Sequence, residues 1–270
     1  SYDSYAACLA MAGARPRYVT LRFPDFALDR DALWAAAGPR CRAILLNSPH
    51  NPTGKVLDAD EREMVAELCL ERGLIAITDE VYEHLVYDGS HHVPLATLAG
   101  MRERTLTLSS AGKTLAFTGW KVGWAVGPAY LVAGVQAAHQ FLTFCAATPL
   151  QAAVAEALAG LDAAAREKLL QAYTERRDYL CSALEQAGMR VARPQGTYFV
   201  MADIGGLTEQ DDRSFVASLI RERGVAAIPS SAFYPVTPAE GRRLVRFAFC
   251  KRMETLQQAV DRLLGQRAAV

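Results

Sequence analysis

The sequence predicts an α/β fold in which a mainly parallel sheet is covered by helices and is followed by a smaller C-terminal α+β domain. Short apolar runs at 42–47, 74–79 and 105–108 have the length of buried strands. Between the first two of them, 58–72 has helical periodicity and is closed by Gly73. Strands that alternate with helices are typical of a parallel sheet with helices on its faces.

The other elements of the first 160 residues follow from the same patterns. Small residues predict a helix at 5–13, and Asp29 is a suitable N-cap for a helix that ends at Ala37. Apolar runs predict further strands at 17–21 and 122–126. Beyond Ala129 the chain is alanine-rich and helical, and Pro149 interrupts it once.

The C-terminal third has a different pattern. A long charged helix is predicted at 162–187, and we interpret it as a connection between two domains. The remaining elements are predicted strands at 189–192, 196–203, 225–228 and 244–249, with helices at 212–223 and from Met253. We therefore expect a large domain at 1–160 (its N-terminal part missing), a connecting helix at 161–188 and a small domain at 189–270.

The composition excludes several classes of function. The 270 residues carry a formal net charge of zero, so there is no basic excess to attract nucleic acid or a membrane surface. No apolar run has transmembrane length, and the N-terminus lacks a signal-peptide pattern. The six cysteines form no C-x-x-C pair and lie mostly in apolar runs, which is typical of a reducing compartment. We expect a cytoplasmic protein.

Lys113 follows the strand at 105–108 and is the first candidate for chemistry. A solvated loop lysine is one interpretation. The other is an amine that forms a Schiff base with a carbonyl cofactor. The hydroxyls of Ser109 and Ser110 and the cation of Lys121 favour the second, because together they suit a phosphate. The stretch could therefore hold both ends of a phosphorylated aldehyde, with Ser109 the weaker phosphate candidate.

Asn51 and Asp79 also follow strands, so the sheet would present them with Lys113 at one edge. Pyridoxal phosphate needs a lysine and a carboxylate against its pyridine nitrogen. Asp79 fits this need, although a helix cap or a solvent-exposed carboxylate is an equal alternative. Tyr82 and Asn51 could donate to the phenolate oxygen of the ring. Lys113, once displaced as a free amine, could then move the substrate α-proton.

Arg246 is the candidate for binding a substrate carboxylate. It alternates with apolar residues in the strand at 244–249, where an arginine usually has an anionic partner. A bidentate arginine is the natural group to hold the carboxylate of an amino acid. The alternative is a surface arginine on an edge strand. His50 is expected to be an ordinary loop histidine, and the adjacent His91 and His92 point apart, which argues against a metal site.

Five segments together resemble class I/II aminotransferases of pyridoxal-phosphate fold type I. They are Asn51–Gly54, Asp79–Tyr82, Ser110–Lys113, Gly119–Gly123 and Val245–Phe247, in that order. The resemblance spans nearly the whole chain and implies a three-layer PLP-dependent transferase fold with pyridoxal 5'-phosphate as cofactor.

The resemblance also implies residue roles and substrates. Lys113 is the catalytic Schiff-base lysine, Asp79 pairs with the pyridine nitrogen, Tyr82 and Asn51 bond the phenolate oxygen, Ser110 and Lys121 bind phosphate, and Arg246 with Asn51 binds the substrate carboxylate. The Gly-Trp-Lys-Val-Gly form is similar to the kynurenine, glutamine and methionine aminotransferase branch. Residues 47–50 and 78–85 are similar to actinobacterial N-succinyldiaminopimelate aminotransferases. We expect an aromatic or sulfur amino acid, kynurenine or N-succinyl-diaminopimelate as donor and a 2-oxoglutarate-type acceptor.

The chain departs from the family at its front, because members of the family begin well before Ser1. The earlier part normally supplies the N-terminal arm, part of the phosphate site, the aromatic ring that stacks on the cofactor and a tyrosine given across a dimer interface. We expect a homodimer in the full-length form, and an isolated chain that binds the cofactor weakly and is barely active. The alternatives are a PLP-dependent carbon–sulfur β-lyase of the same fold, an inactive fragment, or a regulator domain.

Overall fold

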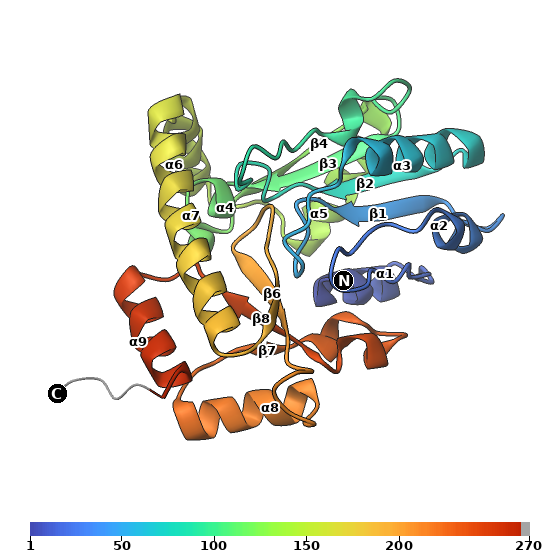
Figure 1. The fold of residues 1–270 in the computed structure, drawn as a ribbon. Helices are drawn as coiled ribbons and strands as arrows, with labels where there is room; N and C mark the ends of the chain where they lie inside the picture. Colours follow the sequence, from blue (N-terminus) through green and yellow to red (C-terminus); the bar gives the residue numbers. More distant parts are fainter. Residues whose placement is uncertain (266–270) are drawn as a thin grey trace. The chain divides into compact units, whose positions relative to one another are not determined.

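The structure is a computed structural model that describes residues 1–265, and it contains two compact units (Figure 1). The first unit comprises Ser1–Asp29, His50–Lys55 and Gln171–Val270. The second comprises Arg30–Pro49 and Val56–Leu170. Each unit has its own sheet, so the predicted combination of a mainly parallel sheet and a C-terminal α+β part is confirmed.

The sheet of the second unit has the strand order β1-β2-β3-β4. Strands β1 (Ala43–Asn47), β2 (Ile75–Asp79) and β3 (Thr105–Ser110) are parallel. Strand β4 (Gly123–Val126) runs antiparallel to β3. The parallel strands bring their carboxyl ends to one edge, where Asn47 lies opposite Asp79.

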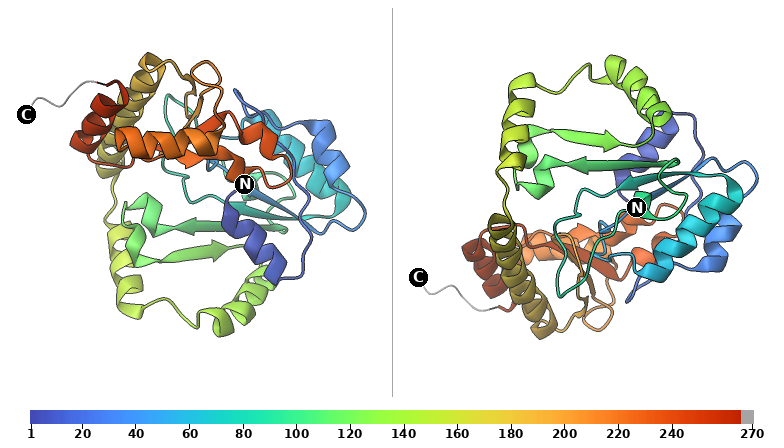
Figure 2. Two further views of the ribbon diagram at one scale, coloured as in Figure 1. Left: turned by 90° about the horizontal axis from the view of Figure 1, so that it is seen from below. Right: turned by 90° about the horizontal axis from the view of Figure 1, so that it is seen from above.

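Some helices of this unit connect these strands, and others precede β1 or follow β4. Asp58 caps the helix between β1 and β2: its carboxylate accepts from the Glu61 amide, and the Glu61 side chain accepts from the Asp58 amide. Gly73 ends the same helix with a φ of 63°. Figure 2 shows the two helices after β4 on the β4 side of the sheet. The helices are α2 (Arg30–Ala36), α3 (Ala59–Arg72), α4 (Ala111–Thr114), α5 (Ala129–Leu142) and α6 (Thr148–Ala159), with short 3₁₀ turns η1 (Leu95–Thr97) and η2 (Thr118–Trp120).

The sheet of the first unit is antiparallel, with the strand order β5-β6-β8-β7. The strands are β5 (Arg190–Ala192), β6 (Phe199–Asp203), β7 (Ile228–Pro229) and β8 (Leu244–Ala248). Helix α8 contacts both β7 and β8. The helices are α1 (Asp3–Met11), α8 (Asp212–Ser218) with its π-helical continuation η3 (Leu219–Arg223), and α9 (Met253–Leu263), with 3₁₀ turns η4 (Ser230–Phe233) and η5 (Pro238–Gly241). The predicted long helix is α7 (Ala163–Gln186), which spans the boundary of the two units.

The predicted strand at 17–21 is wrong, because this segment pairs with no strand. Side chains hold it in place: the Tyr234 hydroxyl donates to the Leu21 carbonyl at 3.0 Å. Leu21 and Phe23 also pack against a buried cluster that contains Phe26 and Tyr234. These contacts explain why 1–29 groups with the C-terminal part of the chain. The contact-based units thus differ from the expected division at 160 and 188, and that division stays a prediction.

Among residues 1–265, no helix combines the length and the apolar character that crossing a membrane requires.

The capping box predicts a measurable stability effect. Asp58→Ala removes the carboxylate that accepts from the Glu61 amide, so we expect the free energy of unfolding to fall by about 1 kcal/mol. Asp60→Ala, which removes an exposed first-turn carboxylate without a capping bond, is the matched control and should cost less. Urea unfolding monitored by circular dichroism measures both, and equal losses would contradict a specific role for the cap.

Candidate active site

Lys113 lies where β3 gives way to helix α4. Ser110 caps this helix, since its hydroxyl accepts from the Gly112 amide at 3.2 Å and donates to the Val122 carbonyl at 3.3 Å. Lys113 is partly buried in the last turn of α4, and its Nζ lies 5.6 Å from the centroid of the Tyr82 ring. The Tyr82 side chain is buried, with 4% of the residue exposed. This environment differs from that of a solvated loop lysine.

Two glycines let the stretch after Lys113 fold back onto β3. A Cβ at Gly123 would lie 2.8 Å from the Ser109 carbonyl oxygen, and a Cβ at Gly112 would lie 3.0 Å from the Cα of Thr118. A Cβ at Gly123 would clash with the backbone, and a Cβ at Gly112 would force the Thr118 backbone to shift. Gly119 differs, because nothing lies within 4 Å of a Cβ built there. Close backbone approach therefore explains two of the three glycines in this stretch.

Asp79 ends β2 and is held through its backbone and its side chain. Its carbonyl accepts from the Asn47 amide group at 2.7 Å and from the Ser48 backbone amide at 3.2 Å. Its Oδ1 accepts from the Val81 amide at 3.2 Å. The residue keeps partial solvent exposure. A carboxylate in a fixed direction thus lies at the edge of the sheet, on the strand next to the one that leads to Lys113.

The predicted phosphate groups have different surroundings. Lys121 is exposed, and its backbone has a left-handed φ of 56° after η2. Ser109 donates its hydroxyl to Glu83 Oε1 at 2.5 Å, so a phosphate at this hydroxyl would meet a carboxylate. The Ser110 hydroxyl is also engaged, with the Gly112 amide and the Val122 carbonyl. The phosphate roles of Ser110 and Lys121, and the weaker one of Ser109, stay predictions.

Asn51 and Arg246 lie together in the first unit. Arg246 donates from a terminal nitrogen to Asn51 Oδ1 at 2.7 Å, and Asn51 is 9% exposed. The guanidinium carbon lies 4.1 Å from the centroid of the Phe199 ring and 4.9 Å from that of Phe233. Strand β8 pairs with β6 on one side and β7 on the other, so Arg246 is not on an edge strand. This removes the edge-strand alternative.

A tight turn fixes the backbone around Asn51. The Gly54 amide donates to the His50 carbonyl at 2.8 Å, and Gly54 has a φ of 72°. A Cβ at Gly54 would lie 2.3 Å from the Cβ of Pro194, while the Gly196 amide donates to the Gly54 carbonyl at 2.7 Å. Only glycine fits this position, both for its backbone conformation and for its space.

Arg177 contacts this turn through Pro194, and no motif of the sequence singles it out. The residue is 0% exposed and donates to the Pro194 carbonyl at 3.3 Å. A signal was present, because Arg177 shares the helical spacing of Tyr173, Leu180 and Leu184, all of which are buried. A charged residue on a buried helix face indicates a polar partner in the interior.

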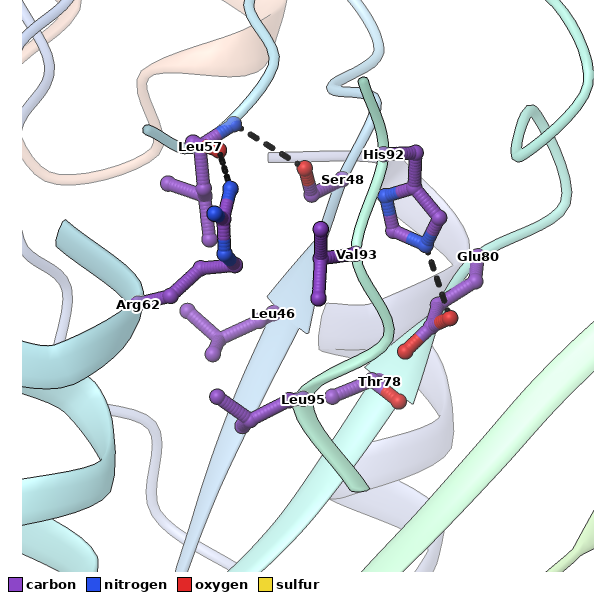
Figure 3. Close-up of a pocket in the computed structure, with 9 residues that line it drawn as sticks. All are labelled: Leu46, Ser48, Leu57, Arg62, Thr78, Glu80, His92, Val93 and Leu95. Atoms are coloured by element: carbon purple, nitrogen blue, oxygen red, sulfur yellow. Dashed lines mark hydrogen bonds and ion pairs between the residues drawn. The ribbon is translucent and has the colours of Figure 1, made fainter. Parts of the chain in front are cut away.

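Glu80 and His92 form a buried pair that the sequence also did not reveal. Their Oε2 and Nε2 atoms are 2.8 Å apart, and the side chains are 2% and 6% exposed. They line a cavity of about 20 Å³ together with residues from β1, β2 and α3 (Figure 3). That volume accommodates one water molecule. The cavity is therefore too small for a cofactor or an amino acid.

The second unit presents a donor set that fits a phosphorylated aldehyde with a ring nitrogen. Lys113 supplies an amine, and Tyr82 supplies a phenol whose ring lies near that amine. Asp79, on the neighbouring strand, supplies a carboxylate with a fixed orientation. Among residues 1–265, no group of three His, Cys, Asp or Glu side chains could hold a metal ion.

Comparison with known proteins agrees with this chemistry. The family model described as aminotransferase class I and II matches residues 1–263. A probable N-succinyldiaminopimelate aminotransferase from Mycobacterium tuberculosis is 50% identical over 99% of this chain and 70% of its own length. The structure of N-succinyldiaminopimelate aminotransferase from that organism matches with a TM-score of 0.93 and 49% identity, over 98% of this chain and 69% of that one.

Two further relatives have other substrates in their names. The human kynurenine–oxoglutarate transaminase 1 is 38% identical over 97% of this chain and 69% of its own length. The Escherichia coli protein YbdL, described with a methionine aminotransferase function, has a TM-score of 0.90 and 35% identity, over 98% of this chain and 69% of that one.

His50, next to Asn51, predicts a pH dependence of stability. Burial of its ring lowers the pKa of His50 from 6.5 to about 3, with smaller contributions from the N-terminal amine and Lys55. Between about pH 6.5 and pH 3, His50 binds a proton in the unfolded chain but not in the folded chain. The free energy of unfolding is therefore highest above about pH 6.5 and decreases as the pH falls. Because the residue keeps partial solvent contact, the loss between pH 7 and pH 5 is at most about 2 kcal/mol.

His50→Gln tests this expectation, since glutamine keeps a polar group near Thr53, whose Oγ1 is 2.8 Å from His50 Nδ1. Denaturant unfolding at several pH values should show a weaker pH dependence in the variant. His139→Gln, on the exposed face of α5, is the control. If the free energy of unfolding depends on pH equally in His50→Gln and in the wild type, His50 is not the source of the pH dependence.

Proposed function

The chain belongs to the aminotransferase class I and II family, whose members use pyridoxal phosphate, and we propose that it transfers an amino group from an N-succinyl-diaminopimelate-type donor to a 2-oxoglutarate-type acceptor. The donor is proposed from the relative that is 50% identical over nearly the whole chain. Kynurenine and methionine-type amino acids are the second candidates, because relatives that are 38% and 35% identical carry those names.

The observation that carries the proposal is the position of Lys113, whose amine lies 5.6 Å from the centre of the buried Tyr82 ring. Bound pyridoxal phosphate supplies a carbonyl that links to amines and a ring that accepts electrons from the α-carbon. With the cofactor bound, Lys113 Nζ would hold that carbonyl until a substrate amine displaces it. As a free amine, Lys113 would then be the base that takes the proton from the substrate α-carbon and hands it to the cofactor carbon that carried the carbonyl.

The other proposed cofactor contacts follow from the resemblance of the sequence. Asp79 pairs its carboxylate with the ring nitrogen and keeps that nitrogen protonated, which strengthens the ring as an electron acceptor. Its bond from Val81 limits the rotation of the carboxylate. The remaining contacts are Tyr82 and Asn51 to the phenolate oxygen, and Ser110 and Lys121 to the phosphate.

Arg246 is proposed to bind the carboxylate next to the amino group of the donor, and then that of the oxo acid, with Asn51 as its neighbour. A guanidinium has five N–H donors, so Arg246 can bond Asn51 and a carboxylate at the same time. Its position over the faces of Phe199 and Phe233 favours the planar cation and restricts its rotation.

The alternatives from the sequence gain no support. The family model and the relatives reported above are aminotransferases, and nothing in them favours a carbon–sulfur β-lyase, an inactive fragment or a regulator domain. A cytoplasmic homodimer remains part of the proposal, on the basis of the cysteine usage and the resemblance of the sequence.

Lys113→Ala tests the catalytic assignment. In the full-length protein supplied with pyridoxal phosphate, we expect the variant to lose the visible absorbance of lysine-bound cofactor and about 10²–10⁴-fold of its turnover, the usual contribution of a positioned base. A coupled assay with N-succinyl-diaminopimelate, kynurenine and methionine as donors measures this and ranks the donors. Lys168→Ala changes an exposed lysine of α7 and should behave as wild type. Full turnover in the Lys113 variant would overturn the proposal.

Arg246→Gln tests the carboxylate site. Loss of hydrogen bonds from a charged group costs about 1.5–3 kcal/mol, so kcat/KM should fall by about 10–150-fold for donor and acceptor alike. Arg246→Lys keeps the charge and should recover only part of the loss, because lysine lacks the planar pair of donors. Arg252→Gln, at an exposed position without a side-chain capping bond, is the control. A loss confined to one of the two substrates would contradict a shared site.

A further inference from the structure

The buried pair of Glu80 and His92 has no part in the chemistry proposed above. Glu80 is the first residue after β2, and its Oε2 lies 2.8 Å from His92 Nε2 (Figure 3). Leaving a carboxylate this deeply buried without a partner is costly, and removing one member of such a pair is more costly than replacing both. The hydrogen bond with His92 therefore offsets the cost of burying the Glu80 side chain at the end of the strand.

The Glu80–His92 pair lies on the opposite face of the sheet from the Asp79 side chain. Successive side chains of a strand point to opposite faces, so Thr78 and Glu80 share one face and Asp79 takes the other. Figure 3 shows Thr78 and Glu80 at the same cavity, with Leu46 of the neighbouring strand. His92 thus cannot reach a ligand of Asp79, and any effect on that ligand passes through the backbone.

The backbone link between the pair and Asp79 is short. The Glu80 amide donates to the Leu108 carbonyl at 2.8 Å, which extends the pairing of β2 and β3 past Asp79. The next amide, that of Val81, donates to Asp79 Oδ1 at 3.2 Å. A rotation of the Glu80–Val81 peptide would break the second bond and release the carboxylate of Asp79. Glu80 resists such a rotation because both its amide and its side chain are held.

The segment that carries His92 is fastened over the same face. Val93 and Leu95 line the cavity with His92, and Leu95 is 4% exposed. Arg62 of α3 closes another side, and among the described residues its Nε has no hydrogen-bond partner. These side chains leave too little space for a ligand larger than water. The contact of His92 with Glu80 is a polar connection between this segment and the end of β2.

We propose that His92 is a positioning residue, which holds Glu80, and through Glu80 the turn at 79–81, so that the Asp79 carboxylate keeps the direction in which it meets the ring nitrogen. The proposal rests on the proposed function for the role of Asp79. The mechanical part, from His92 to the Val81 amide, does not need a cofactor.

His92→Leu tests the first step, with His92→Gln as the conservative variant, because a glutamine amide can donate to Glu80 from nearly the same place. Without cofactor, hydrogen exchange of the Glu80 and Val81 amides should become at least about tenfold faster in His92→Leu and return toward wild type in His92→Gln. With cofactor, titration of the full-length protein should show about tenfold weaker binding of pyridoxal phosphate in His92→Leu, as for outer partners of metal ligands.

Thr105→Val is the matched control. It removes a buried hydroxyl bond to the Met101 carbonyl at the opposite end of β3, so it weakens the same sheet away from Asp79. If Thr105→Val speeds exchange at Glu80 and Val81 as much as His92→Leu does at equal stability, the pair is only a general stabilising contact and the proposal is overturned. Exchange and affinity within twofold of wild type in His92→Leu would overturn it as well.

A second variant and a comparison of cofactor affinities complete the test. If His92→Leu does not fold, Glu80→Gln replaces the charge at constant size, and the same amides are expected to exchange faster. A wild type that binds pyridoxal phosphate no more tightly than Lys113→Ala would refute the role of Lys113 in the proposed function. The exchange measurement would still decide whether His92 positions the turn.

Discussion

The parallel hydrogen-bond ladder of β1, β2 and β3 is the constraint on which the second unit depends. Its register sets Asn47 opposite Asp79 and Asp79 opposite Leu108, so three strand ends meet at one edge. The ladder does not stop abruptly. Asn47 and Ser48 both donate to the Asp79 carbonyl, and Glu80 donates to Leu108. These extra bonds carry the order of the sheet into the turns that hold the reactive side chains.

In the first unit, a side-chain hydrogen bond and two aromatic rings hold Arg246 in place. A guanidinium in a central strand must be compensated, because β6 and β7 flank β8 on both sides. The compensation comes from Asn51 and from two aromatic faces. Asn51 in turn depends on the turn closed by Gly54.

The sequence was informative where a local pattern carries the structural information. The apolar runs located β1, β2 and β3, and Asp58 marked a helix start. The order of the motifs predicts Lys113, Asp79 and Tyr82 as site residues, and the structure places the Lys113 amine near the Tyr82 ring. It was not informative where the outcome depends on distant partners. The run at 17–21 has the composition of a strand, but its partner is the hydroxyl of Tyr234, more than 200 residues away, and not another strand. No local pattern encodes such a choice.

The same limit applies to the groups that support the candidate site. Arg246 could not be assigned to a central or an edge strand from its own neighbours, because strand order is a property of the whole sheet. The position of His92 beside His91 argues against a metal site, but it does not reveal that the partner of His92 is Glu80, twelve residues earlier. The hydroxyl of Ser109 suggests a phosphate contact, whereas in the structure it donates to Glu83. In each case the residue type was informative and the partner was not predictable.

Both sets of candidate residues follow one physical logic. A charged group that must meet a ligand in a fixed direction is held by bonds on its own side, so that little reorganisation is needed when the ligand arrives. Asp79 is restrained by the Val81 amide, and Arg246 by Asn51 and the ring faces. The supporting pairs are Glu80 with His92, and Arg177 with the Pro194 carbonyl. Each pair places an ionisable side chain in the interior, where it is costly without its partner. Such groups are difficult to explain by stability alone, since apolar residues would pack these places at lower cost. Under the proposed function, the property that these pairs maintain is the direction of the partly exposed charges of Asp79 and Arg246.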